Sequence, residues 1–269
     1  MRSDVIMKAL LHTGDILQSP FVQKMWLPNK ITSWAEVPSL PLPVALHFPG
    51  QRKLNPSQEK AVNVILSNHD TDRVALIHGP PGTGKTTVIA AAVTSVMSSP
   101  DQSPTLWIVA QSNVAIKNVA EKLGDIGFFN FKLLVSKDFH FDWLACLPSY
   151  APCLLRFYRR HEHLYENIAS NVIRSDDFVN SRVLIERLLL GSRVVLCTLS
   201  MLSHPKLSPF MQLVPPQTVI FDEASQIEIG DYFPLLCRFQ HTLSKLVFIG
   251  DDKQRKCIVL LIYYDLTCP

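Results

Sequence analysis

The sequence predicts an α/β fold, in which helices cover both faces of a parallel sheet. Short apolar runs recur along the chain, and stretches with helical spacing separate most of them. Several of these runs are continuously apolar, as is typical of strands buried on both sides. A glycine-rich loop directly after the first run supports a doubly wound topology. The expected strands are residues 74–77, 106–110, 194–198, 218–221 and 246–249, and an additional one can be placed at 131–135.

The glycine-rich loop has the composition of a phosphate-binding loop. Residues 78–87 read HGPPGTGKTT, with the G-x-x-x-x-G-K-T spacing of a P-loop NTPase. Glycine permits the backbone conformations that let several N–H groups converge on a triphosphate. Lys85 supplies a positive charge for the β- and γ-phosphates, and the Thr86 hydroxyl is a ligand for Mg²⁺. We therefore assign nucleotide binding to Gly79, Gly82, Thr83, Gly84, Lys85 and Thr86.

Two adjacent carboxylates follow another apolar run. Residues 219–226 read VIFDEASQ, so a strand would deliver Asp222 and Glu223 at its carboxyl end, where ligands bind in open α/β sheets. We expect Asp222 to hold Mg²⁺ and Glu223 to polarise an attacking water as a general base. The alternative is that the pair merely caps a helix, since acidic residues favour that place too. The phosphate loop earlier in the chain favours the catalytic interpretation.

Two glutamines complete the expected nucleotide site. Residues 246–254 read LVFIGDDKQ, and Gln254 could report on the γ-phosphate as a third catalytic residue. Upstream of the loop, Gln58 offers a donor and an acceptor together, which suits the exocyclic amine and adjacent ring nitrogen of adenine. The alternative for Gln254 is that it lies in an ordinary turn after a strand. The alternative for Gln58 is that it belongs to a helix-capping segment and has no role in binding the base.

These four elements, in this order, resemble the first motor domain of superfamily-one helicases of the Upf and senataxin type. The segments DEASQ (222–226) and GDDKQ (250–254) match the second and third motifs of that family, and the resemblance covers about residues 52–254. It implies a RecA-like fold with ATP and Mg²⁺ as cofactors. It also implies that ATP hydrolysis is coupled to translocation along single-stranded RNA or DNA.

The resemblance further implies contacts with the sugar–phosphate backbone of that single strand. Ser112 and Asn113, which follow the strand at 106–110, match one family contact, and Thr198 matches a second. Small hydroxyls and amides suit this role because they bond phosphate oxygens without reading bases. The competing interpretation is that these residues only cap the helices that follow them.

The rest of the chain divides around this core. Residues 1–50 are rich in proline and are expected to form an irregular lead-in with one short helix near 3–18. Residues 51–254 form the RecA-like ATP-binding domain. It carries a helical insertion at about 125–192, in which 162–190 reads as helices. Residues 255–269 match nothing expected of the family and form a C-terminal tail.

The sequence leaves the enzymatic status open. Helicases of this type use two RecA-like domains, and the second supplies arginines for the transition state of phosphoryl transfer. The 269 residues stop soon after Gln254, so we expect nucleotide binding with slow hydrolysis and no unwinding. The alternatives are a catalytically incomplete nucleotide-binding module and, with less support, an AAA-type ATPase, whose sensor asparagine and helical lid have no match here.

Composition adds weaker constraints. The apolar fraction of 47% is enough for a sizeable core, and a net charge of +3 is compatible with a nucleic-acid partner without arguing for one. The six cysteines include no C-x-x-C pair, which disfavours a disulfide framework or a zinc site and indicates a reducing compartment, the nucleus or cytoplasm. No apolar run is long enough to cross a bilayer as a helix, so no membrane partner is expected.

Overall fold

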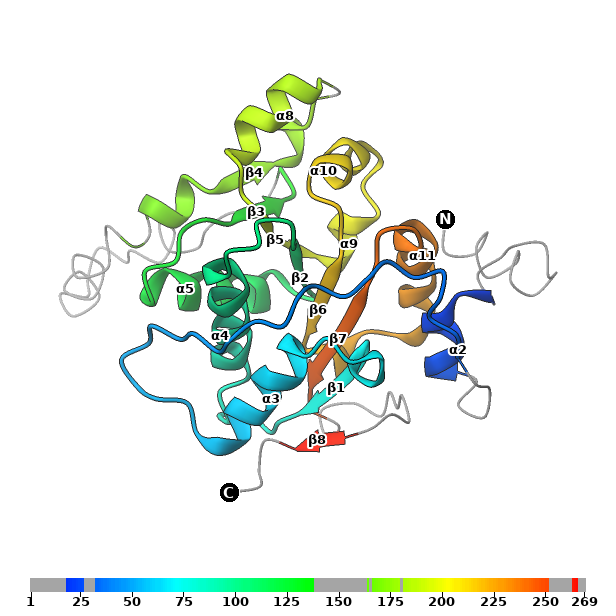
Figure 1. The fold of residues 1–269 in the computed structure, drawn as a ribbon. Helices are drawn as coiled ribbons and strands as arrows, with labels where there is room; N and C mark the ends of the chain where they lie inside the picture. Colours follow the sequence, from blue (N-terminus) through cyan, green and yellow to red (C-terminus); the bar gives the residue numbers. More distant parts are fainter. Residues whose placement is uncertain are drawn as a thin grey trace.

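A parallel sheet forms the centre of the protein (Figure 1). The computed structural model describes residues 18–26, 32–137, 164, 166–179 and 181–251, together with the backbone of 263–265. Within these residues eight strands follow one another in the order β4-β3-β5-β2-β6-β7-β1-β8, and neighbouring strands are parallel. They are β1 (Val74–His78), β2 (Leu106–Ala110), β3 (Lys132–Val135), β4 (Val172–Arg174), β5 (Val194–Thr198), β6 (Thr218–Asp222), β7 (Lys245–Gly250) and β8 (Tyr263–Asp265).

This sheet confirms the predicted α/β class. The five strands expected from the sequence are β1, β2, β5, β6 and β7, and the additional one at 131–135 is β3. Trp107 on β2 illustrates why these runs are continuously apolar. Its side chain is fully buried, and its only polar atom, Nε1, donates to Val214 O at 2.9 Å. A strand that is covered on both faces can therefore bury a bulky side chain whichever face that side chain points to.

Helices cover both faces of the sheet and bury two separate cores. Helices α3, α4 and α5 pack on one face, and α2 with α8 to α11 pack on the other (Figure 1). Among the described residues, no helix is both long and apolar enough to span a membrane. The helices are α2 (Pro20–Trp26), α3 (Pro56–Leu66), α4 (Lys85–Ser98), α5 (Asn113–Asp125), α8 (Arg182–Leu189), α9 (Leu199–Leu202), α10 (Ser208–Leu213) and α11 (Ile229–Phe239). Short 3₁₀ turns are η2 (Asp70–Asp72), η3 (Ser175–Asp177), η4 (Pro205–Leu207) and η5 (Ala224–Gln226).

Helix α3 is held at both ends by side chains. At its start, Asn55 Oδ1 accepts from Gln58 N (2.8 Å) and Gln58 Oε1 accepts from Asn55 N (3.0 Å), which is a capping box. At its end, the buried Lys245 ammonium donates to Val64 O (2.7 Å) and Ser67 O (2.8 Å). Burial lowers the pKa of Lys245 to about 8. Because α3 packs against α4, these bonds fix Gln58 beside the loop from which α4 begins.

The N-terminal lead-in is more ordered than the sequence predicted. The expectation of an irregular segment over 1–50 does not hold for helix α2. Its residues packed into the core are Phe21, Val22 and Met25. Further along, His47 is bonded to α4, since its N–H donates to Ser95 Oγ and its C=O accepts from Thr94 Oγ1, both at 2.8 Å. Figure 1 shows this segment crossing α4 on its way to α3. The helix expected near 3–18 lies outside the described residues except for its last one.

The stretch expected to be helical at 162–190 also contains a strand. Strand β4 pairs with β3, with Val172 opposite Leu133, and Ile173 is buried. Turn η3 follows β4, and α8 occupies the end of the stretch. A three-residue strand carries too little pattern to be seen in a sequence, so its pairing with β3 decides its conformation.

Candidate nucleotide-binding site

The expected site residues lie along one edge of the sheet, where the carboxyl ends of the strands meet. Pairing places Thr198 on β5 opposite Ala110 on β2, and Ala110 opposite Asp222 on β6. Next along the sheet, Gly250 at the end of β7 lies opposite His78 at the end of β1. The order along this edge is therefore the expected strand contacts, the acidic pair, the third motif and the phosphate loop.

The loop between β1 and α4 folds around the Lys85 ammonium. Lys85 Nζ donates to Gly79 O (2.6 Å) and to Pro80 O (3.2 Å). Thr83 Oγ1 donates to the same Pro80 oxygen at 2.8 Å. Gly82 has φ of +82°, and a Cβ at this position would point into open space. The positive charge is thus held in place by loop carbonyls, which phosphate oxygens can replace as acceptors.

Gln58 is bonded to the phosphate loop as well as to its own helix. Its Nε2 donates to Thr83 O at 2.9 Å, while its Oε1 serves the capping box. Gly84 has φ of +84°, which favours glycine, and a Cβ there would lie 2.4 Å from Gln58 Nε2, so a larger residue would also displace this amide. This geometry fits both interpretations of Gln58, as a residue of the helix cap and as a residue that binds adenine. An amide nitrogen carries two hydrogens and its oxygen two lone pairs, so one of each remains for a base.

The acidic pair lies at the end of β6. Asp222 is buried, and its Oδ1 accepts from Glu223 N at 2.9 Å. Burial raises the pKa of Asp222 to about 6, with a smaller effect of the same sign from Glu223 and opposing effects from the Glu223 N–H and Lys85. Glu223 has φ of +52°, in the left-handed region that is uncommon outside glycine. Glu223 Oε2 accepts from Ser112 Oγ at 3.4 Å.

The residues present fit a Mg²⁺–nucleotide. Asp222 is a buried carboxylate whose ionisation is opposed by its surroundings, and a divalent cation offsets that cost. Thr86 lies in the first turn of α4 and offers a hydroxyl oxygen, the kind of donor that Mg²⁺ prefers. Lys85 acts electrostatically on Asp222, so loop and carboxylate share one site. The described residues contain no cluster of three or more His, Cys, Asp or Glu side chains suited to a metal.

Asp222→Asn is expected to stabilise the nucleotide-free protein at neutral pH. A carboxyl with a raised pKa binds more protons when folded, so wild-type stability falls as pH rises from about 4 to about 6. The shift limits this effect to about 3 kcal/mol. Urea unfolding at pH 4 and pH 7.5 should show that the unfolding free energy of the variant, relative to that of the wild type, increases as the pH rises. A gap between the two proteins that does not change with pH would contradict this prediction.

The third motif packs directly on the second. A Cβ on Gly250 would lie 3.0 Å from Ser225 N and 3.3 Å from Ser225 Oγ. The Gly250 carbonyl accepts from Gly79 N at 2.9 Å, which links the motif to the phosphate loop. Asp251 follows, buried, with its Oδ1 3.8 Å from His78 Nε2. Sequence reasoning missed this acid–histidine contact, although each residue adjoins a recognised motif. Gln254, the expected γ-phosphate sensor, lies outside the described residues.

Gly250→Ala is expected to destabilise the fold by about 1–3 kcal/mol, because the added methyl group meets backbone at Ser225. Urea unfolding measures the loss. Ser225→Ala is the matched control. Its buried hydroxyl has no hydrogen-bond partner among the described residues, so removing that hydroxyl should cost less than about 0.5 kcal/mol. Equal stability of Gly250→Ala and wild type would show that the two motifs are not in tight contact.

The expected strand contacts follow β2 and β5. Ser112 caps α5, since its Oγ accepts from Ala115 N at 3.1 Å, and Asn113 is exposed in the first turn. Thr198 Oγ1 lies 3.0 Å from Ser200 Oγ. Ser112 therefore does cap the helix that follows it. It does not exclude a strand contact, because the hydroxyl proton is not used by the cap.

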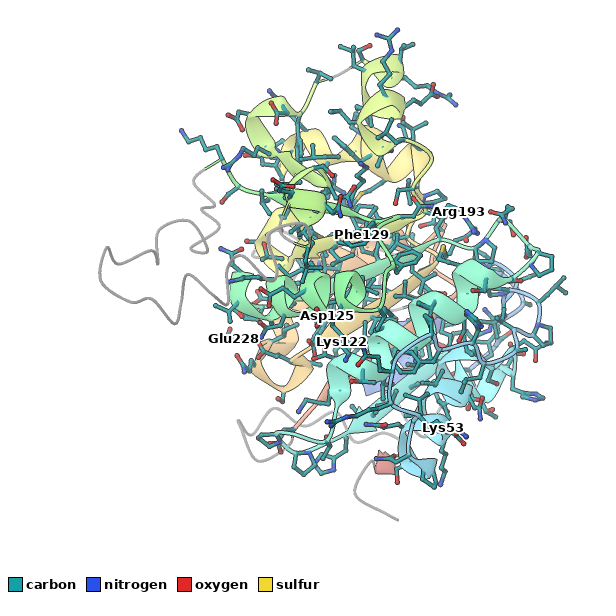
Figure 2. The ribbon with its side chains drawn as sticks, turned by 90° about the vertical axis from the view of Figure 1, so that its left-hand side faces the viewer. Lys53, Lys122, Asp125, Phe129, Arg193 and Glu228 are labelled. Carbon is teal, nitrogen blue, oxygen red and sulfur yellow. The ribbon has the colours of Figure 1, made fainter. Side chains whose placement is uncertain are left out.

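A cavity of about 550 Å³ beside Gln58 brings in residues that the sequence did not single out. Figure 2 shows Lys122 and Asp125 on α5 and Lys53 on the segment before α3. These side chains line the cavity together with Arg52. They come from segments far apart in the chain, so no local pattern marks them. The cavity opens next to Thr87 on α4 and adds basic groups to the surroundings of the nucleotide site.

Fold and site together define a P-loop NTPase motor domain. The chain belongs to the AAA_11 family, described as an AAA domain, which it matches over residues 53–137 and 158–260. It is a superfamily-one helicase motor domain of the Upf1-like type, as the DEASQ and GDDKQ segments predicted. A nucleotide-binding helicase domain is therefore established as its class.

The relatives are much longer proteins. The chain is 28% identical over 231 residues to "DNA polymerase alpha-associated DNA helicase A" of Saccharomyces cerevisiae, covering 75% of this chain and 32% of that one. It is 27% identical over 225 residues to "Regulator of nonsense transcripts 1" of Caenorhabditis elegans, covering 81% and 20%. A solved structure of the DUF1998 helicase MrfA bound to DNA and AMPPNP matches 80% of this chain and 27% of that chain, with 12% identity and a TM-score of 0.45. The chain thus spans a third or less of each of these proteins.

Proposed function

We propose that this chain binds ATP with Mg²⁺ and hydrolyses it as the first motor domain of a helicase that moves along single-stranded RNA or DNA. One observation carries the proposal. The buried Asp222 and its neighbour Glu223 stand at the carboxyl end of β6, within electrostatic reach of Lys85 in the phosphate loop. A carboxylate for the metal and a second for water, facing a cradle for phosphates, is the arrangement that phosphoryl transfer to water requires.

Each residue then has a distinct task. Lys85 leaves its loop carbonyls and neutralises the β- and γ-phosphates, while loop N–H groups and the start of α4 bind their oxygens. Thr86 and Asp222 hold Mg²⁺, which when bound offsets charge on the transferred phosphoryl group. Glu223 takes a proton from the attacking water. Gln58 orients the base with the donor and acceptor that its capping bonds leave unused.

Single-stranded nucleic acid is the proposed partner, at Ser112, Asn113 and Thr198. These residues lie along the same sheet edge, on the side of the acidic pair away from the phosphate loop. The names of several relatives support a nucleic-acid partner, including "ATP-dependent helicase upf1" of Schizosaccharomyces pombe and "DNA-binding protein SMUBP-2" of Mesocricetus auratus. Hydroxyl and amide contacts to phosphates tolerate both RNA and DNA.

ATP turnover by the purified chain, with and without poly-U or poly-dT, tests the proposal. We expect ATP turnover that either polymer stimulates, because the proposed strand contacts lie on the same sheet edge as the acidic pair. Calorimetric titration with Mg²⁺–ATP should give saturable binding. Absence of heat and saturation on folded protein would overturn the proposal. Tight binding with no turnover under any condition would instead favour a non-hydrolysing nucleotide-binding module.

A further inference from the structure

The hydroxyl of Ser112 lies between the two halves of the proposed site. On one side it faces Glu223, whose Oε2 it contacts at 3.4 Å. On the other side it caps α5, where the proposed strand contacts begin. Strand pairing explains this contact, because Ala110 on β2 and Asp222 on β6 are partners. Ser112 lies two residues after Ala110, and Glu223 directly follows Asp222.

We propose that Ser112 is a positioning residue through which a bound single strand controls the water-activating carboxylate of Glu223. This inference rests on the function proposed above. Without a strand, the Ser112 hydroxyl donates to Glu223 and restrains it. When a strand phosphate accepts that proton instead, Glu223 is released toward the attacking water.

The chemistry of a serine hydroxyl makes the two bonds mutually exclusive. A hydroxyl has only one proton to donate, and one of its two lone pairs accepts from Ala115 N in the cap. Glu223 and a strand phosphate therefore compete for the same hydrogen. At 3.4 Å the present bond is long, since a hydroxyl bonded to an anion normally lies at about 2.5–2.7 Å. A phosphate that approaches to the normal distance displaces it readily.

The backbone around Glu223 is fixed, so the side chain is the part that can move. Turn η5 is closed by Gln226 N donating to Glu223 O at 2.9 Å, and Tyr232 Oη donates to Ala224 O at 3.0 Å. Ser225 is packed on Gly250. The left-handed φ of Glu223 is thus held from both sides, and release of its carboxylate requires only rotation about side-chain bonds.

A double-mutant cycle on strand affinity tests this competition. Binding of a fluorescein-labelled oligo-dT is measured by anisotropy, without nucleotide, for wild type, Ser112→Ala, Glu223→Ala and the double variant. Removing Glu223 should tighten binding about fivefold more when Ser112 is present than when it is absent. The loss of a negative charge near the strand acts in both backgrounds and cancels. Equal tightening in both backgrounds would overturn the inference.

Turnover gives a second readout that a purely structural role does not move. Ser112→Ala should raise the strand-free kcat with little change in KM for ATP, and so lower the stimulation by poly-dT. Ser112→Thr keeps both the hydroxyl and the cap and should restore the stimulation. A lost cap alone would lower both rates together and leave their ratio unchanged, which contradicts the proposal.

If wild type neither binds oligo-dT nor is stimulated, the proposed function fails as well. If it is stimulated but the cycle is additive, only the role of Ser112 fails.

Discussion

Replacing Lys85 with alanine is expected to abolish Mg²⁺–ATP binding. In the structure its ammonium is held at the centre of the phosphate loop by Gly79 O and Pro80 O. Charge-assisted bonds to phosphate are roughly twice as strong as neutral ones. Their loss should weaken binding by about 100-fold or more, equivalent to about 3 kcal/mol. Calorimetric titration of the folded variant, with folding checked by circular dichroism, measures the change.

Lys206→Ala is the control for this variant. Lys206 is exposed on η4, outside the phosphate loop, and its removal takes away the same charge from the protein. It should bind Mg²⁺–ATP as tightly as the wild type. If Lys85→Ala binds as tightly too, the nucleotide site has been placed in the wrong part of the chain.

The sheet could be predicted because its strands are buried on both faces. Runs such as Leu106–Ala110 and Val194–Thr198 are apolar throughout, and that pattern needs no knowledge of the partners. Strand β4 is different, because three residues become a strand only when β3 lies beside them. Helix α2 was missed for a similar reason. Its apolar residues are surrounded by proline-rich chain, and only packing on the sheet reveals their role.

The sequence predicts which residues form the proposed site, but it does not predict how their side chains contact one another. Fixed spacing in the chain marks Lys85, Asp222 and Glu223, since the chemistry demands those residue types after a strand. The bond from Gln58 to Thr83 O, and the contact between Ser112 and Glu223, join segments that are far apart in sequence. Such contacts depend on strand order, which a single sequence does not contain.

Glu223→Gln is expected to separate binding from chemistry. Glutamine has nearly the same shape, so the left-handed turn at this residue is kept, and its amide oxygen can still accept from Ser112 Oγ. An amide cannot take a proton from water at neutral pH. Turnover should therefore fall by about 10²–10⁴-fold, the usual contribution of a general base, while Mg²⁺–ATP affinity stays within about twofold of wild type.

Glu228→Gln, at the exposed acid just before α11 (Figure 2), makes the same chemical change at a residue outside the acidic pair. It should retain wild-type turnover, which shows that the loss at Glu223 is not a general charge effect. Single-turnover hydrolysis of pre-bound ATP is the appropriate assay, because it isolates the chemical step from nucleotide exchange. If Glu223→Gln hydrolyses pre-bound ATP at the wild-type rate, the water must be activated by another group. Asp222 is then the only neighbouring carboxylate of the motif, and its task as metal ligand would have to be reassigned together with that of Glu223.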